Sequence, residues 1–193
     1  MPDTSTDAAA GLPARRFGWE DMFVPPEEDS RFDGPCADER SVLANQLRNH
    51  RLTLELKCGG LDAEQLAQRS VPPSTLSLLG LVRHVAERER HWFRRTMAGK
   101  DVSRIWPTSG VDGALDGAVA DPAMVEQAWT AWRREIVFAE RFVAEAPSLD
   151  VRGHRGDRMV LLRELLVDAI GEYARHVGHA DLLRERIDGR VGR

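Results

Sequence analysis

Apolar residues in the last part of the chain recur every three or four positions, the period of one face of an α-helix. The inward positions of this stretch are Leu162, Leu166, Ala169, Tyr173, His176, Ala180, Leu183 and Ile187. Such a stripe is stable in water only when other elements cover it. We therefore expect a long, packed helix from about Arg158 to Asp188, which ends before Gly189.

Three earlier stretches show the same helical period, and they cover residues 38–58, 74–99 and 121–146. Ser74 or Ser77 can cap the second stretch, and Asp121 followed by Pro122 can begin the third. The third is expected to bury Val125, Trp129, Trp132, Ile136, Ala139 and Val143. No segment shows the alternation of a β-strand, so the prediction is an all-α fold, a four-helix bundle.

The remaining segments divide the chain into an extension and one bundle domain. Residues 1–36 are rich in Pro, Gly, Asp and Glu and lack periodicity, so we expect an N-terminal extension. Residues 37–193 are enough for one hydrophobic core but too few for two ordinary domains. A long connection rich in Gly, Asp and Pro, residues 101–120, separates the second and third predicted helices.

Composition excludes several classes of protein. The formal net charge of −4 and the pI near 5.9 argue against a nucleic-acid partner, which favours a basic surface. There is no secretory signal and no apolar run long enough to cross a membrane, so we expect a cytoplasmic protein. Cys36 and Cys58 lie far apart and are expected to be free thiols. The motifs of serine hydrolases, P-loop proteins and dithiol enzymes are missing.

Polar residues interrupt the apolar stripe of the last helix. Glu172, His176 and His179 fall within about 60° of one another on a helical wheel and face inward or nearly so. An acid and imidazoles placed against a core must be hydrogen-bonded, paired or metal-bound, because an unsatisfied buried charge is costly. A surface ion pair or a satisfied core network is one interpretation of this group, and a metal site is the other.

The metal interpretation needs ligands from a second helix. Glu172 and His176 lie one helical turn apart, so a single divalent ion can bridge them, as in other helix bundles. The candidates for a further ligand are His50, His84, His91 and His154, and periodicity does not choose among them. His179 can serve as a ligand or can orient the group through a hydrogen bond.

Two motifs resemble one known group of proteins. PPSTLSLLGLVRHVAERERHWFRR, residues 72–95, and GEYARHVGHADLLRERIDG, residues 171–189, are similar to motifs of the DinB-like superfamily of four-helix metalloproteins. The resemblance covers about residues 38–189 and is strongest to an actinobacterial branch that includes mycothiol-dependent transferases. This branch is related to mycothiol-dependent maleylpyruvate isomerase. The resemblance implies a DinB-type bundle with a long connection between helices two and three.

The resemblance also implies a ligand set. In that superfamily a histidine in the second helix and two residues one turn apart in the last helix hold a divalent metal, and here these positions are His84, Glu172 and His176. Many relatives have histidine where this chain has Glu172, so either Glu172 or His179 completes the site. Zinc is the favoured ion, with nickel, iron and manganese as alternatives. His91 is a further candidate for the surroundings of the metal.

The implied activity is transfer of a low-molecular-weight thiol, mycothiol, to an electrophilic small molecule in a detoxification reaction. A metal with an open position lowers the pKa of a thiol that occupies it. Arg83, Arg88 and Arg175 are the candidates for substrate binding. The alternatives are a metal-dependent hydrolase, in which water occupies the open position, and a non-catalytic, stress-related binding protein.

Two surface features complete the sequence-based picture. The loop around residues 105–107 could close over the site, and the run ERERHWFRR, residues 87–95, is expected to be a solvated face. An exposed edge at Trp92 and Phe93 within this run would allow a homodimer.

Overall fold

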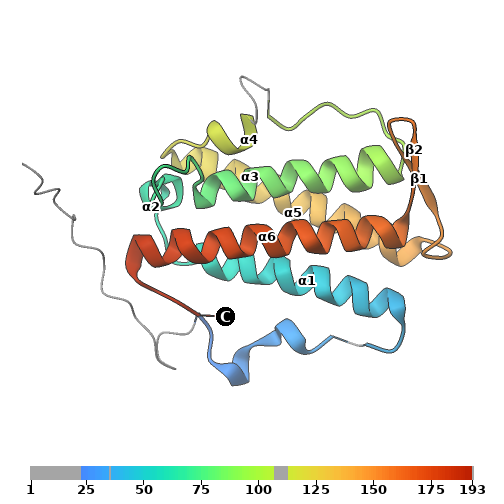
Figure 1. Ribbon diagram of the computed structural model, residues 1–193, viewed down its shortest axis with the longest axis horizontal. Coiled ribbons are helices and arrows are strands. Elements are labelled where there is room, and N and C mark those ends of the chain that lie inside the picture. The colour runs from blue at the N-terminus through green and yellow to red at the C-terminus, as the bar shows by residue number, and fades with distance from the viewer. Residues whose placement is uncertain (1–22, 35, 107–112, 193) are drawn as a thin grey trace, which may run out of the picture.

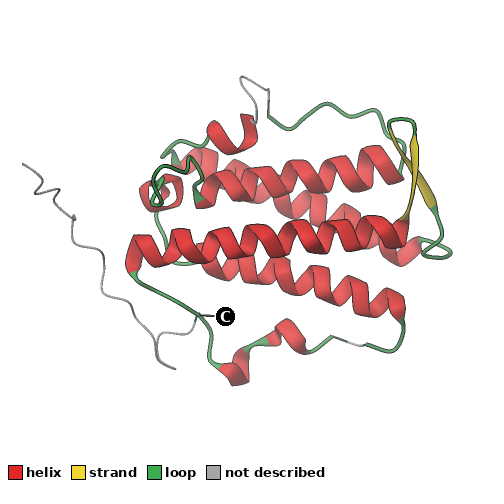
Figure 2. Ribbon diagram, viewed as in Figure 1, coloured by secondary structure: helices red, strands yellow, loops and turns green. Residues whose placement is uncertain are grey.

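The computed structural model describes residues 23–34, 36–106 and 113–192. The protein is mostly helical, and its long helices run side by side (Figures 1 and 2). These are α1 (Glu39–Cys58), α3 (Leu78–Glu89), which the π-helix η4 (Arg90–Met97) continues, α5 (Pro122–Glu145) and α6 (Leu162–Asp188). The shorter elements are η2 (Pro26–Glu28), η3 (Ser30–Phe32), α2 (Ala63–Ala67), α4 (Gly113–Asp116), β1 (Arg152–Arg155) and β2 (Arg158–Leu161). The all-α prediction is therefore confirmed.

The ends of the long helices follow local sequence signals. The side chains of Asp38, Ser77 and Asp121 accept hydrogen bonds from backbone N–H groups in the first turns of α1, α3 and α5. Pro122 occupies the first turn of α5, where its missing N–H has no cost. Gly189 ends α6 with φ +79, a conformation that favours glycine. Of the two caps expected for α3, Ser77 is the one observed.

The core lies between the four long helical segments. α1 packs mainly on α6, α3 packs mainly on α5, and α3 also contacts α6. The largest fully buried side chains are Trp92, Trp132, Tyr173, Phe93 and leucines from α1, α3 and α6. On α5 the buried stripe is Ala128, Ala131, Trp132, Glu135, Ala139 and Val143. The predicted Val125, Trp129 and Ile136 are only partly buried, and the buried stripe instead includes Glu135, which is paired with Arg90 and Arg94.

A β-hairpin precedes α6, so the expectation of no strand and of a helix starting at Arg158 was wrong. β1 and β2 pair antiparallel around a turn in which Gly156 has φ +61. Gly153 packs against the backbone of Thr96, where a Cβ atom would overlap the Thr96 carbonyl. Each strand has four residues, too few for alternation to be visible in the sequence.

The run of residues 87–95 is not the solvated face that the sequence suggested. Glu89, Trp92 and Phe93 are all completely buried. The predicted exposed edge at Trp92 and Phe93 is therefore wrong, because both rings belong to the core, and it cannot form a dimer interface. None of the helices in the described part of the chain is long and apolar enough to cross a membrane.

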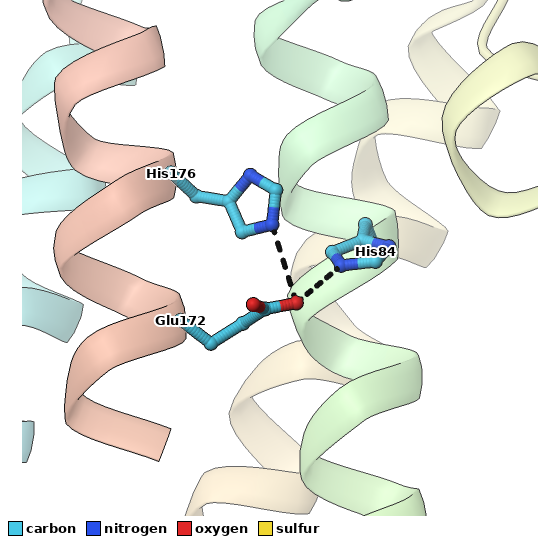
Figure 3. Close-up of side chains that lie close together, drawn as sticks. All are labelled: His84, Glu172 and His176. Atoms are coloured by element: carbon cyan, nitrogen blue, oxygen red, sulfur yellow. Dashed lines mark hydrogen bonds and ion pairs between the residues drawn. The ribbon is translucent and has the colours of Figure 1, made fainter. Parts of the chain in front are cut away.

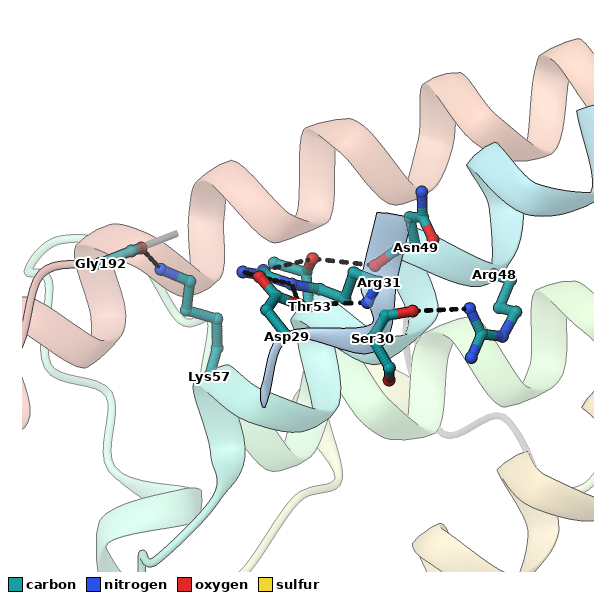
Figure 4. Close-up of polar contacts among 8 residues, drawn as sticks. All are labelled: Asp29, Ser30, Arg31, Arg48, Asn49, Thr53, Lys57 and Gly192. Carbon is teal, nitrogen blue, oxygen red and sulfur yellow. Dashed lines mark hydrogen bonds and ion pairs between the residues drawn. The ribbon is translucent and has the colours of Figure 1, made fainter. Parts of the chain in front are cut away.

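The described part of the N-terminal segment is fastened to α1, and α1 is in turn joined to the residues that follow α6 (Figure 4). Arg31 is paired with Asp29 and donates a hydrogen bond to the Thr53 hydroxyl at 3.1 Å. Arg48 donates to the Ser30 carbonyl at 3.2 Å, and Lys57 donates to the carbonyl of Gly192. The contacts of Arg31 and Ser30 hold the segment along α1, on the side away from α3 (Figure 1).

Candidate metal site

His84, Glu172 and His176 meet between α3 and α6 (Figure 3). The Nε2 atom of His84 lies 3.3 Å from Oε1 of Glu172, and the Nε2 atom of His176 lies 3.5 Å from the same oxygen. The two imidazole rings approach edge to face, with 4.7 Å between their centroids. One nitrogen or oxygen from each residue falls within 4.8 Å of the others, so this group could hold a metal ion.

The helices position these side chains by simple periodicity. Glu172 and His176 are four residues apart on α6, so both project from the same side of that helix. His84 lies near the middle of α3, next to the buried Val85, and is itself only partly buried. It therefore lies at the edge of the buried stripe. Because α3 packs against α6, this edge faces Glu172 and His176.

The surroundings of His176 and Glu172 keep these two residues in the protonation states that metal ligands need. Burial, with a further contribution from the neighbouring His84, lowers the pKa of His176 to about 4, so its imidazole is neutral at neutral pH. Burial raises the pKa of Glu172, but the hydrogen bond from His84 and the charge of Arg88 outweigh it and lower the pKa below its usual value. The cluster therefore combines neutral imidazole with an ionised carboxylate.

Two of the three donor separations match those around a divalent ion, and the third lies within 4.8 Å. Bonds of about 2.0–2.1 Å in a tetrahedral arrangement place ligand atoms about 3.4 Å apart. The two contacts to Glu172, at 3.3 Å and 3.5 Å, already match that separation. Two imidazole nitrogens and one carboxylate oxygen form a donor set typical of catalytic zinc, in which a further position stays open to a substrate.

The other predicted histidines take different places. The Nδ1 atom of His179 lies 3.4 Å from Nδ1 of His176, so His179 contacts a cluster member rather than Glu172. His91 is half-buried on η4 among arginines, where burial and then Arg88 lower its pKa. His50 is half-buried on α1, and His154 is exposed on β1. None of these last three belongs to the cluster formed by described residues.

Two of the three predicted arginines contact the cluster. Arg88 Nε lies 3.6 Å from Oε1 of Glu172, and Arg175 Nη1 lies 3.1 Å from Oε2. Arg83 is buried elsewhere: it donates to the Gly113 carbonyl at 3.2 Å, and its guanidinium lies over the ring of Trp106. Its neighbours are therefore α4 and the connecting loop.

The loop expected to close over the site is anchored on a neighbouring face of α3. The backbone N–H of Ile105 donates to Glu87 at 2.8 Å, and Trp106 is buried against Arg83. Pro107, which completes the predicted loop, lies outside the described residues.

A buried network beside the cluster was missed by the sequence analysis. The Trp132 indole donates to the Tyr173 hydroxyl, and this hydroxyl donates to Oε1 of Glu89, both at 2.8 Å. Arg51 donates to both oxygens of Glu89, at 2.8 Å and 2.9 Å. Each long helix contributes one member. The signal in the sequence was Glu89 itself, because it lies in phase with the buried Val82, Val85 and Ala86.

Comparison with models of known protein families identifies the family of this chain. The model of the mycothiol-S-transferase family matches residues 42–189, which includes all of α3, α5 and α6 and most of α1. The chain belongs to the mycothiol-S-transferase family. The match spans both motifs on which the resemblance to the DinB-like branch rested, so that resemblance is confirmed. Searches of curated proteins and of solved structures found no match.

Proposed function

We propose that this chain is a metal-dependent S-transferase that conjugates mycothiol to an electrophilic small molecule, and that its helices form a DinB-type bundle. The cluster of His84, Glu172 and His176 carries the proposal, because it joins two helices through three donor atoms within 4.8 Å. Membership of the mycothiol-S-transferase family supports the choice of thiol. A neutral His176, whose pKa is about 4, supports metal binding at neutral pH.

In the proposed reaction the protein residues hold a metal ion and orient the thiol. His84, Glu172 and His176 are the ligands of a divalent ion, for which zinc is favoured. Such an ion lowers the pKa of a thiol bound beside it. The thiol proton leaves to solvent, the sulfur lone pair forms the bond to the electrophilic carbon, and the leaving group departs with its electron pair.

The experiment follows mycothiol consumption with 1-chloro-2,4-dinitrobenzene, which releases chloride as the new C–S bond forms. We expect zinc-loaded protein to accelerate the reaction, a chelator to abolish the acceleration, and zinc to restore it. Ester or amide cleavage that needs metal but no thiol would indicate a hydrolase instead. Metal binding without turnover of any of these substrates would indicate a binding protein.

The protein's own cysteines provide a control for this assay. Cys36 is exposed, whereas Cys58 is buried, and burial raises the pKa of its thiol to about 12. Neither residue lies in the cluster of possible metal ligands. The Cys36→Ser variant should therefore retain the mycothiol-dependent rate, and a loss of that rate would contradict the proposed use of an external thiol.

His179 is expected to orient His176 rather than bind the metal. His176 presents Nε2 to Glu172, and its Nδ1 faces His179. A proton on His176 Nδ1, donated to His179, leaves the Nε2 lone pair available for a metal. We expect His179→Ala to weaken zinc affinity about 10-fold to 100-fold, and His179→Gln, which offers an acceptor oxygen, to retain most of it.

The measurement is competition with a fluorescent zinc chelator, and Glu172→Ala is the comparison. If His179→Ala abolished zinc binding while Glu172→Ala left it intact, His179 would be the third ligand and the assignment of Glu172 would be wrong.

A further inference from the structure

The guanidinium of Arg88 lies beside the cluster and has hydrogen-bond donors available to a ligand. It lies over the indole of Trp92, with 4.9 Å from its carbon Cζ to the ring centroid, and this contact restricts its position. Its Nε is buried, yet 37% of the side chain is exposed. Among the described residues it makes an ion pair with Glu172 at 3.6 Å but no hydrogen bond within ordinary distance.

Arg175 approaches Glu172 from the other side. It lies 3.1 Å from Oε2, whereas Arg88 is nearest to Oε1, so the two guanidiniums bracket one carboxylate. The side chain of Arg175 is 67% exposed and can move toward a ligand. Glu172 is the one carboxylate that either arginine contacts within the described parts of the chain.

The charges of this site do not balance. Two guanidiniums, which stay protonated at any ordinary pH, flank a single carboxylate, that of Glu172. As a metal ligand, Glu172 would also share its charge with a divalent cation. A deprotonated thiol offsets one of the added positive charges, and an excess of positive charge remains on a protein whose net charge is −4.

We propose that Arg88 and Arg175 bind a carboxylate of the electrophile, so that the acceptor substrate of this protein is an anionic small molecule. The planar guanidinium matches a carboxylate in a bidentate pair, which is stronger and more directional than a neutral hydrogen bond. Because Arg88 lies beside the metal ligand Glu172, a carboxylate held there keeps the rest of the molecule within reach of the thiol. This inference rests on the proposed S-transferase function.

The test compares two electrophiles of the same shape that differ mainly in charge, 4-(chloromethyl)benzoate and 4-(chloromethyl)benzamide, with mycothiol as the thiol and each rate divided by the uncatalysed rate. We expect kcat/KM for the benzoate to exceed that for the benzamide by about tenfold or more, since a charge-assisted pair is worth at least that factor. The Arg88→Gln variant should lose this preference. Arg95→Gln, which removes an exposed arginine of η4, should retain it.

A binding measurement separates this inference from the reaction itself. Unreactive benzoate is titrated into zinc-loaded protein by calorimetry, and elemental analysis gives the zinc content of each variant. We expect saturable binding that Arg88→Gln weakens about tenfold and that added salt weakens further. Zinc content should not fall in Arg88→Gln, because the substitution removes a cation close to the ligand Glu172.

The outcomes distinguish the two proposals. Equal rates for both electrophiles in the wild type would overturn the inference and leave the S-transferase function standing. If neither these electrophiles nor 1-chloro-2,4-dinitrobenzene reacted, the function would fail, and the titration alone would decide. Binding weakened in Arg88→Gln upholds the anion site, whereas no saturable binding, or binding unchanged in Arg88→Gln, overturns it.

Discussion

Replacement of His84 by alanine is expected to remove bound metal and thiol-transfer activity together. His84 is the proposed ligand from α3, and Glu172 and His176 are the proposed ligands from α6. Two donors one turn apart on a single helix hold an ion weakly, and the third donor across the helix interface completes the site. We expect zinc affinity to fall by more than about 100-fold, beyond the range that changes outside the ligand set produce.

The measurement is zinc content by elemental mass spectrometry on protein purified without an affinity tag. His176→Ala should give the same result as His84→Ala. His91→Ala is the matched control, because His91 is also a half-buried histidine of the helical segment α3–η4 but lies outside the cluster. Wild-type protein that stayed metal-free after incubation with zinc or nickel would contradict the proposed site.

Thermal unfolding provides an independent test of the expected loss of zinc binding in His84→Ala. A ligand that binds only the folded state stabilises it by about 2.7 kcal/mol when its concentration is 100 times Kd. For a chain of this size that corresponds to a rise in Tm of roughly 5–10 °C. We expect this rise on addition of zinc to the wild type and to His91→Ala, and no rise for His84→Ala.

Replacement of Glu89 by glutamine should be the most destabilising conservative change in the protein. Glu89 is fully buried, and it accepts hydrogen bonds from Arg51 and from the Tyr173 hydroxyl. Glutamine keeps the shape but leaves the buried guanidinium of Arg51 with only the exposed Glu140, at 3.5 Å, as a counter-charge. Breaking a buried pair in this way costs about 3–5 kcal/mol, a large fraction of the total stability of an ordinary domain.

The measurement is the free energy of unfolding from denaturant titration of metal-free protein. Glu145→Gln is the control, because the Arg141–Glu145 pair is exposed and should contribute little. The double variant Arg51→Met with Glu89→Gln should lose less than the two single variants combined, since it removes both charges. A loss below about 1 kcal/mol for Glu89→Gln would show that this network does not hold the helices together.

The buried hydrogen-bond network around Glu89 also helps to position the two helices of the candidate metal site. Tyr173 follows Glu172 directly on α6, and Glu89 follows Arg88 directly on α3. The hydrogen bond between Tyr173 and Glu89 therefore ties together the two helices that carry the proposed ligands. Trp132 and Arg51 extend the same constraint to α5 and α1.

Much of the helical architecture could be predicted because its signals are local. An N-cap such as Asp38 acts within one helical turn, and Gly189 stops α6 through its own backbone conformation. The inward positions of Glu172 and His176 followed from the period of α6 alone. The choice of His84 as their partner came from resemblance, and the structure brings it to 3.3 Å from Glu172.

Other features depend on contacts between segments that are distant in sequence. The burial of Glu89 requires Arg51 from α1 and Tyr173 from α6, 38 and 84 residues away. The short hairpin needs the backbone of Thr96 to cover Gly153. Helix period and helix ends are set within a turn or two of chain, so they could be predicted from local sequence. The compensation of buried charge and the meeting of the proposed ligands across an interface depend on packing, so they became visible in the three-dimensional structure.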